Sequence, residues 1–361
     1  MALPRNPLIL LIPLALLLVV LGCSSPAPTP TPEPTATATP IPPTPTFTPT
    51  PTATPTPTPS LSSVVAQLRA SVVKVTAGDV QLSGVALANP PNHVLTTSVS
   101  LGAGPLVTVR TDSGQTFQGW IVGRDDTANL ALVRVIGGTI PGVQFGNSSG
   151  VAVGAQVVSI GYPVARPGAT PIEGTVTAVR TDFATGVRFL RVDAPPVAGS
   201  MGGAVFNRSG QFLAMNVESS YIQSLGMSAG DETFAKAEDT IQLAVPGLTA
   251  GAWSMKARPM PQGNSGSPPP TPLIIKGKAV TTGSAVVPSG VRVFGRLFAS
   301  GLADLWYVSD VEQGGTFSMT IGVLDPAYAS GKIELYYDGV KSGTVLNYQA
   351  GQVVEQTFSF P

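Results

Sequence analysis

The sequence has few of the residues from which many catalytic and cofactor sites are built. Its 361 residues include a single cysteine, Cys23, and a single histidine, His93. One cysteine excludes a disulfide framework, a thiolate metal cluster and a CxxC redox pair, and one histidine excludes a multi-histidine metal site. We therefore expect no cofactor and no metal.

Charge and aromatic residues are also scarce. The 20 Lys and Arg residues balance the 20 Asp and Glu residues, and only 11% of the chain is charged, compared with about 25% in typical proteins. Nucleic acid is therefore not an expected partner, because its binding draws on a basic surface. Aromatic residues make up 6%, whereas Gly and Pro number 40 and 36. This composition favours turn-rich β structure joined by stiff spacers over helix bundles.

The N-terminus carries an export signal. Arg5 is followed by an apolar run from Leu8 to Gly22 and by the string VLGCSS, and this run is shorter than the roughly 20 residues of a membrane-spanning helix. The string resembles the lipobox of bacterial lipoproteins. The resemblance implies a signal peptide over 1–22 and a lipidated Cys23 that anchors the protein at the extracytoplasmic face of a membrane. An ordinary secreted protein with an incidental cysteine is the alternative.

Two proline-rich segments divide the rest of the chain. Residues 23–60 are almost entirely Pro and Thr, a composition that favours extended polyproline II and predicts a stalk. A second cluster, SPPPTP, lies in a predicted linker over 257–272. The expected domains are therefore 61–256 and 273–361, in agreement with about two domains for this length.

The region 61–256 is predicted to be an all-β domain. LSSVVAQLRA predicts a short amphipathic helix, and short apolar runs then recur at intervals of about 8 to 15 residues between Gly, Asp, Asn and Pro turns. This spacing predicts a barrel or a sandwich. LAVP and GLTAGAW, near Leu243 to Trp253, predict a last strand and a closing helix.

Four strings in this region resemble one family. They are HVLTTSVSLGAG, GRDDTANLALVRV, VGAQVVSIGYP and GSMGGAVFNRSGQFLAMNV, in that order. Together they resemble the chymotrypsin-like (trypsin-like) serine proteases, most closely the bacterial Htr-type heat-shock branch. The resemblance implies a fold of two β-barrels.

The same resemblance places three unsuitable residues at the catalytic positions. Val99 takes the place of the histidine, Asn129 of the aspartate and Met201 of the serine. Valine cannot accept a proton and methionine cannot form an acyl-enzyme, whereas an amide at the third position is the mildest change. We therefore expect no functional catalytic residue. The backbone of Gly199 and Met201 is expected to form an oxyanion-like loop, although a need for glycine conformations also explains Gly199.

Other arrangements that would keep the protease active remain open. Ser200 is adjacent to the serine position, but using it breaks the spacing to the glycine pair that follows. His93 lies six residues before Val99, and a Ser-Lys pair would need Lys74 or Lys236. Asp125 and Asp126, just before Asn129, are candidate substitute carboxylates, although a solvated turn is the interpretation we favour.

Two classes of function therefore stay open, with a mere envelope spacer as a third. The first is a tethered, non-catalytic module that binds extended polypeptides or envelope proteins, and the second is an active endopeptidase with an unconventional site. Peptide recognition by strand addition needs no catalytic triad. The predicted peptide groove is the strand edge Val217, Glu218, Ser219 and Ser220.

The C-terminal region 273–361 predicts about seven strands. In GKIELYYDG, for example, apolar and polar residues alternate as in a half-buried strand. The pattern resembles the immunoglobulin-like and transthyretin-like sandwiches, so the predicted fold is a two-barrel domain followed by a small β-sandwich. Its aromatic residues favour core and sheet packing over a ligand-binding face; they are Trp306, Tyr307, Tyr336 and Tyr337.

Overall fold

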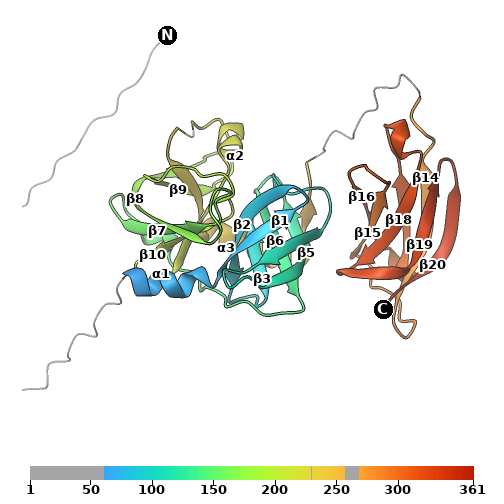
Figure 1. Cartoon of the computed structure of the whole chain (residues 1–361), viewed down its shortest axis with the longest axis horizontal. Coiled ribbons are helices and arrows are strands. Elements are labelled where there is room, and N and C mark those ends of the chain that lie inside the picture. Colours follow the sequence, from blue (N-terminus) through green and yellow to red (C-terminus); the bar gives the residue numbers. More distant parts are fainter. Residues whose placement is uncertain (1–60, 229, 257–267) are drawn as a thin grey trace, which may run out of the picture. The chain divides into compact units, whose positions relative to one another are not determined.

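The structure is a computed structural model that describes residues 61–228, 230–256 and 268–361. The predicted signal peptide, Cys23, the stalk and most of the proline-rich linker lie outside these ranges. The described residues form two β-barrels and a β-sandwich (Figure 1), so the predicted all-β fold class is confirmed. No described helix is both long enough and apolar enough to cross a bilayer.

The first barrel follows a short helix and contains six strands. The elements are α1 (Leu61–Arg69), β1 (Val72–Ala77), β2 (Val80–Leu87), β3 (His93–Thr96), β4 (Leu106–Arg110), β5 (Thr116–Asp125) and β6 (Leu130–Ile136). The antiparallel order β1-β2-β3-β6-β5-β4 closes on itself because β4 pairs with β1. A short later strand, β13 (Trp253–Ser254), pairs in parallel with β5.

The second barrel is closed in the order β10-β11-β12-β9-β8-β7. Its strands are β7 (Gln156–Gly161), β8 (Thr170–Thr181), β9 (Arg188–Val192), β10 (Ala204–Asn207), β11 (Phe212–Asn216) and β12 (Thr233–Ala237). Three helical segments accompany them: η1 (Ser148–Gly150), α2 (Ser219–Ser224) and α3 (Glu238–Thr249). A helix does close the domain, but it covers LAVP, where a strand was predicted, and only the first three residues of GLTAGAW, where the helix was predicted.

One apolar core joins the two barrels. It combines side chains from β1 to β3 with side chains from β7, β10 and β11. Val64 and Leu68 of α1 and Ile241 and Val245 of α3 also belong to it. Helices at both ends of the domain thus pack against strands of both barrels and hold the two barrels together.

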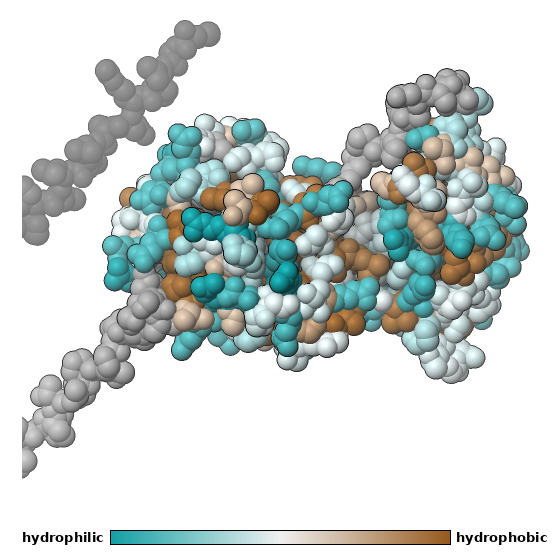
Figure 2. Space-filling model, in the orientation of Figure 1, coloured by the Kyte–Doolittle hydropathy of each residue, from teal (hydrophilic) through white to brown (hydrophobic). Residues whose placement is uncertain are grey.

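The C-terminal part contains two further β-sheets. Its elements are β14 (Leu273–Thr281), β15 (Arg292–Phe298), β16 (Leu305–Asp310), η2 (Gln313–Gly315), β17 (Thr316–Ile321), η3 (Pro326–Tyr328), β18 (Ser330–Tyr337), β19 (Val340–Gln349) and β20 (Val353–Phe360). One sheet has the order β17-β14-β20 and the other β16-β15-β18-β19. Between the sheets lie 17 buried side chains, which give this part a core of its own. The face visible in Figure 2 is mostly hydrophilic or intermediate, with small apolar patches.

Candidate functional site

The three residues that the sequence resemblance placed at the catalytic positions lie on loops at the junction of the two barrels. Val99 follows β3, Asn129 lies in the turn between β5 and β6, and Met201 lies between β9 and β10. The Oδ1 atom of Asn129 accepts hydrogen bonds from the backbone N–H groups of Ser98, at 2.9 Å, and Val99, at 3.0 Å. The structure therefore brings the predicted acid and base positions together, with an amide and an isopropyl group in place of a carboxylate and an imidazole.

Both apolar replacements pack across the junction. Met201 belongs to the second-barrel loop, but it is buried in the apolar cluster of the first barrel, with Val73 and Val75. Val99 follows a first-barrel strand and packs against the second-barrel cluster that contains Val217 and Ile222. Two positions that carry reacting groups in a protease therefore form hydrophobic contacts between the barrels here.

Glu218 is a buried charged residue of this site, which the sequence placed only on a peptide groove. Its side chain comes from the second barrel, is 8% exposed and accepts hydrogen bonds from residues of the first barrel. Asn129 donates to Oε2 at 2.7 Å, and the Thr97 and Ser100 hydroxyls donate to Oε1 at 2.6 and 3.1 Å. A carboxylate from one barrel thus holds the Val99 loop of the other.

The predicted peptide groove differs from the observed backbone. The β11 strand ends at Asn216, and the N–H of Val217 already donates to Phe234 O at 3.0 Å. Ser219 and Ser220 lie in the first turn of α2 rather than on an extended edge. The strand edge expected over 217–220 is therefore too short to pair with an extended peptide, because the chain enters a helix that the strand pattern did not predict.

The loop around Met201 keeps a fixed shape that depends on glycine. Gly199 and Gly202 have φ values of +88° and +83°, and a Cβ on Gly202 would lie 2.1 Å from Ser83 O. The Ser83 hydroxyl donates to Gly199 O at 2.7 Å, and the backbone N–H of Ser83 donates to Met201 O at 2.8 Å. Glycine is therefore required here by conformation and by close packing. Within the described part of the chain, the N–H groups of Gly199 and Met201 donate to no other group.

The aspartates before Asn129 have two different roles. Asp125 is partly exposed and accepts hydrogen bonds from the N–H groups of Thr127 and Ala128, as expected for a turn. Asp126 is not solvated: it is 2% exposed and pairs with the fully buried Arg124 at 2.7 Å. The Arg124 guanidinium also donates to the carbonyls of Ser98, Leu101 and Gly102. A buried ion pair needs hydrogen-bond partners from the protein itself, and here those partners are carbonyls of the Val99 loop. The pair therefore holds that loop in place. Asp126 is occupied by Arg124 and does not act as a substitute acid.

The alternative catalytic groups have other partners. His93 begins β3 and donates to Pro91 O at 2.8 Å, and burial lowers the pKa of its imidazole. Lys236 is fully buried and donates to Ala128 O and to the Tyr221 hydroxyl, and this burial lowers its pKa to about 7. Lys74 lies opposite Ser83 in the β1–β2 pair, but the Ser83 hydroxyl proton is directed to Gly199 O.

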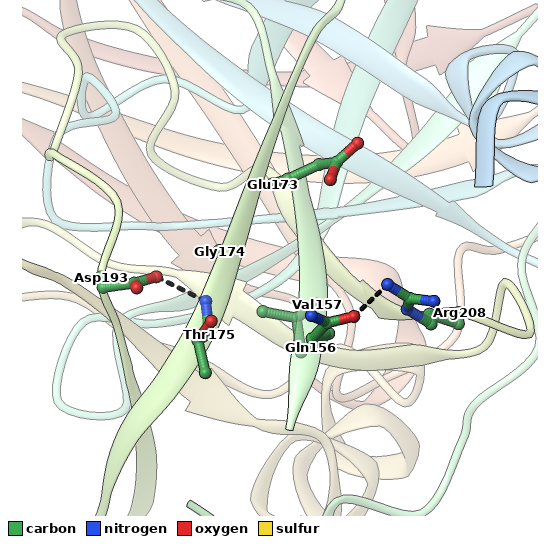
Figure 3. A pocket seen from close by; sticks show the side chains of 7 residues that line it. All are labelled: Gln156, Val157, Glu173, Gly174, Thr175, Asp193 and Arg208. Atoms are coloured by element: carbon green, nitrogen blue, oxygen red, sulfur yellow. Dashed lines mark hydrogen bonds between the residues drawn. The ribbon is translucent and has the colours of Figure 1, made fainter. Parts of the chain in front are cut away.

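Two of the cavities in the described part of the chain lie on the second barrel or at its junction with the first. One, of about 10 Å³, lies beside Ser200, Met201 and Asn216 and has room for about one water molecule. A larger one, of about 240 Å³, lies on the second barrel (Figure 3). In it Thr175 N–H donates to Asp193 and Arg208 donates to Gln156, so its polar groups largely bind one another. In the described ranges, no three His, Cys, Asp or Glu side chains gather to hold a metal ion.

Comparisons with known proteins agree with this geometry. Residues 76–215 match the family described as trypsin-like peptidase domain. A probable periplasmic serine protease, do/HhoA-like, of Haemophilus influenzae is 29% identical over 153 residues, which cover 41% of this chain and 32% of the relative. The serine protease PepD of Mycobacterium tuberculosis is 33% identical over 135 residues, which cover 34% of this chain and 28% of the relative.

The match is confined to one part of each protein. The chain spans about a third of the length of the relatives it matches, so it shares a domain with them rather than a whole architecture. The two closed barrels, the match over 76–215 and these relatives together show that the chain contains a trypsin-like peptidase domain related to the Do/Htr serine proteases.

Proposed function

We propose that the protein is an exported, lipid-anchored and non-catalytic relative of the Do/Htr proteases that acts as a polypeptide-binding or scaffold module. The observation that carries the proposal is the apolar packing of Val99 and Met201 across the barrel junction. A periplasmic relative and the lipobox-like string ending in Cys23 support the extracytoplasmic location.

The loss of catalysis follows from the chemistry of the three positions. Acyl transfer by this fold needs a hydroxyl that attacks the peptide carbonyl, an imidazole that takes up its proton and a carboxylate that orients the imidazole. Met201 has no nucleophilic hydroxyl or thiol, Val99 has no basic atom, and the Asn129 amide is neutral. Neither His93 nor Lys236 is hydrogen-bonded to a serine in the described residues.

Binding of a polypeptide does not require these groups. No hydrogen bond among the described residues uses the N–H groups of Gly199 and Met201, so they can donate to the backbone carbonyl of a bound polypeptide. Ser200 lies between them, but among the described residues neither His93 nor Lys236 is hydrogen-bonded to its hydroxyl. Val164, which is 63% exposed, lies next to them: a Cβ on Gly199 would be 3.0 Å from its side chain. A bound polypeptide would therefore pass along the Gly199 loop and Val164 instead of adding to β11.

The first test is labelling with a fluorophosphonate, together with casein cleavage. We expect neither labelling nor cleavage above that of buffer, because no activated serine is present. The Ser200→Ala variant is the matched control and should behave identically. An adduct on Ser200, or cleavage that Ser200→Ala abolishes, would show instead an active endopeptidase with an unconventional site.

The second test is binding of extended peptides, followed by NMR. We expect affinities in the micromolar to millimolar range, corresponding to about 4–8 kcal/mol, with shifts at the Gly199 and Met201 amides. Val164→Trp should block binding. Val153→Trp is the control, because Val153 is similarly exposed, at 65%, but precedes the opposite end of β7. Unshifted amides at saturating peptide would leave the spacer as the better interpretation.

A further inference from the structure

The orientation of the Asn129 amide is determined by its neighbours. Two backbone N–H groups, those of Ser98 and Val99, donate to one side-chain atom, which must therefore be the oxygen. The Nδ2 group then faces the other way and needs an acceptor. Glu218 Oε2 provides it at 2.7 Å. Position 129 must therefore accept on one side and donate on the other, which an amide does and an ionised carboxylate does not.

Glu218 has the complementary requirement. Its two oxygens receive hydrogen bonds from the Thr97 and Ser100 hydroxyls and from Asn129, all of them on the opposite barrel. An ionised carboxylate only accepts hydrogen bonds, so each of these contacts needs a donor. Without the Asn129 donor, Glu218 Oε2 would lose its hydrogen bond. Water could not readily replace that bond, because Glu218 is only 8% exposed.

We infer that Glu218 supplies the buried negative charge of this cleft, and that Asn129 and Glu218 are a coupled amide–carboxylate pair that positions the Val99 loop. An aspartate at 129 would bring two carboxylate oxygens to about 2.7 Å from each other, and like charges so close are not both ionised. Restoring the acid at 129 is therefore blocked by Glu218.

Other charged groups lie near the Asn129–Glu218 pair, and a test must separate their effects from that of Glu218. Lys236 on β12 and Asp125 at the end of β5 interact electrostatically with each other, and Lys236 also does so with Glu218. The charges of Asp125 and Glu218 also help to raise the pKa of Tyr221 on α2. A measurement that compares Glu218 with glutamine at the same position keeps these neighbours constant and isolates the one charge.

The first experiment exchanges the two groups in the full chain. Asn129→Asp should lower the urea midpoint of unfolding, because it opposes two carboxylates. Asn129→Asp combined with Glu218→Gln should recover most of that loss, because a glutamine amide can donate to the new carboxylate. The Glu218→Gln single variant completes the cycle. If the double variant is as unstable as the sum of the two single changes, the pair is not coupled and the inference is wrong.

The second experiment places a titrating probe in the cleft. Val99→His puts an imidazole in the loop that Glu218 holds, and His93 is the only other imidazole in the chain. We expect the NMR-measured pKa of the new imidazole to be higher by about 1 with Glu218 than with Glu218→Gln. Equal values would overturn the assignment of the charge.

These readouts are independent of the proposed function. Labelling of the unchanged protein by a fluorophosphonate would overturn the non-catalytic proposal. It would leave the coupling between Asn129 and Glu218 standing. Conversely, equal imidazole pKa values would remove the role of Glu218 without restoring a nucleophile to the cleft.

Discussion

Lys236 connects the second barrel to the turn that carries Asn129. Its ammonium group donates to Ala128 O and to the Tyr221 hydroxyl, and it lies 4.9 Å from the centre of the Tyr221 ring. The side chain is fully buried, so the charged form loses its hydration. Burial lowers the pKa to about 7 from the ordinary 10.5, against the opposing pull of Asp125 and Glu218.

This shift predicts a pH dependence of stability. As the pH falls from about 10.5 to 7, the unfolded chain takes up a proton at Lys236 and the folded chain does not, so stability is lost over that window by up to about 1.4 kcal/mol per pH unit. Buried Tyr221, whose pKa is raised to about 12, acts oppositely above pH 10. The observable rise therefore lies between pH 7 and 10.

The measurement is the urea midpoint across this range, followed by near-UV circular dichroism. Lys236→Met should remove the rise between pH 7 and 10. The matched control is Lys74→Met, since Lys74 is only half-buried on β1, and it should keep the rise. A rise of unchanged size in Lys236→Met would show that other groups cause it.

The place of Val99, Asn129 and Met201 at the barrel junction could be predicted from the sequence, whereas the role of Glu218 could not. Val99, Asn129 and Met201 each lie within a string whose neighbours fix the alignment, such as the glycine pair after Met201. Glu218 acts through partners that are 89 to 121 residues away along the chain. Only the folded arrangement of the two barrels shows that contact, and the same holds for the burial of Asp126 against Arg124.

At the scale of elements, α1 packs against both barrels. Val64 and Leu68 pack into the core that also contains Phe206 and Phe212 of the second barrel, while β1 follows directly into the first barrel. Arg69 at its end pairs with Asp112 at 3.1 Å, and Asp112 also accepts from Ala169 N–H at 3.0 Å. The helix therefore links one barrel to the other.

Truncating one side chain of α1 tests this role. Leu68 is 7% exposed, so Leu68→Ala should reduce the free energy of unfolding by about 2–5 kcal/mol, through lost burial and the cavity left behind. Gln67→Ala, on the exposed side of the same helix, should change it by less than about 0.5 kcal/mol. Urea unfolding of the full chain gives both values. Equal, small effects would mean that α1 merely rests on the barrels.

The sequence predicted the elements whose pattern is local and missed those set by tertiary context. The alternating strands of the sandwich and the amphipathic α1 follow from periodicity. In contrast, LAVP is apolar enough for a strand but lies in α3, where Val245 packs into the core and Leu243 is 85% exposed. Similarly, β11 does not continue to Ser220, because Glu218 turns inward to bind the first barrel and α2 begins behind it.

At the scale of the whole molecule, the order of the segments matches a domain held at a distance from a membrane. The lipobox-like string is followed by the Pro- and Thr-rich segment over 23–60. From its composition we predict a stalk, which at about 3.1 Å per residue in polyproline II would reach on the order of 110 Å. Under the proposed function, a non-catalytic domain on such a tether has a use if its surface binds partners at that distance. The anchor is therefore as much a part of the proposed function as the cleft.

The anchor is tested by replacing the one residue that can carry it. Cys23 is the only thiol in the chain, and stable anchoring needs more than one acyl chain, because a single chain binds a membrane only marginally. Cys23→Ala should therefore move the protein from the membrane fraction to the soluble extracytoplasmic fraction, and mass spectrometry should find lipid on Cys23 of the unchanged protein. Ser24→Ala alters the neighbouring residue without removing the thiol and should stay with the membrane. A Cys23→Ala protein that remains firmly in the membrane, together with an unlipidated native Cys23, would favour a secreted protein or one held by its uncleaved apolar segment.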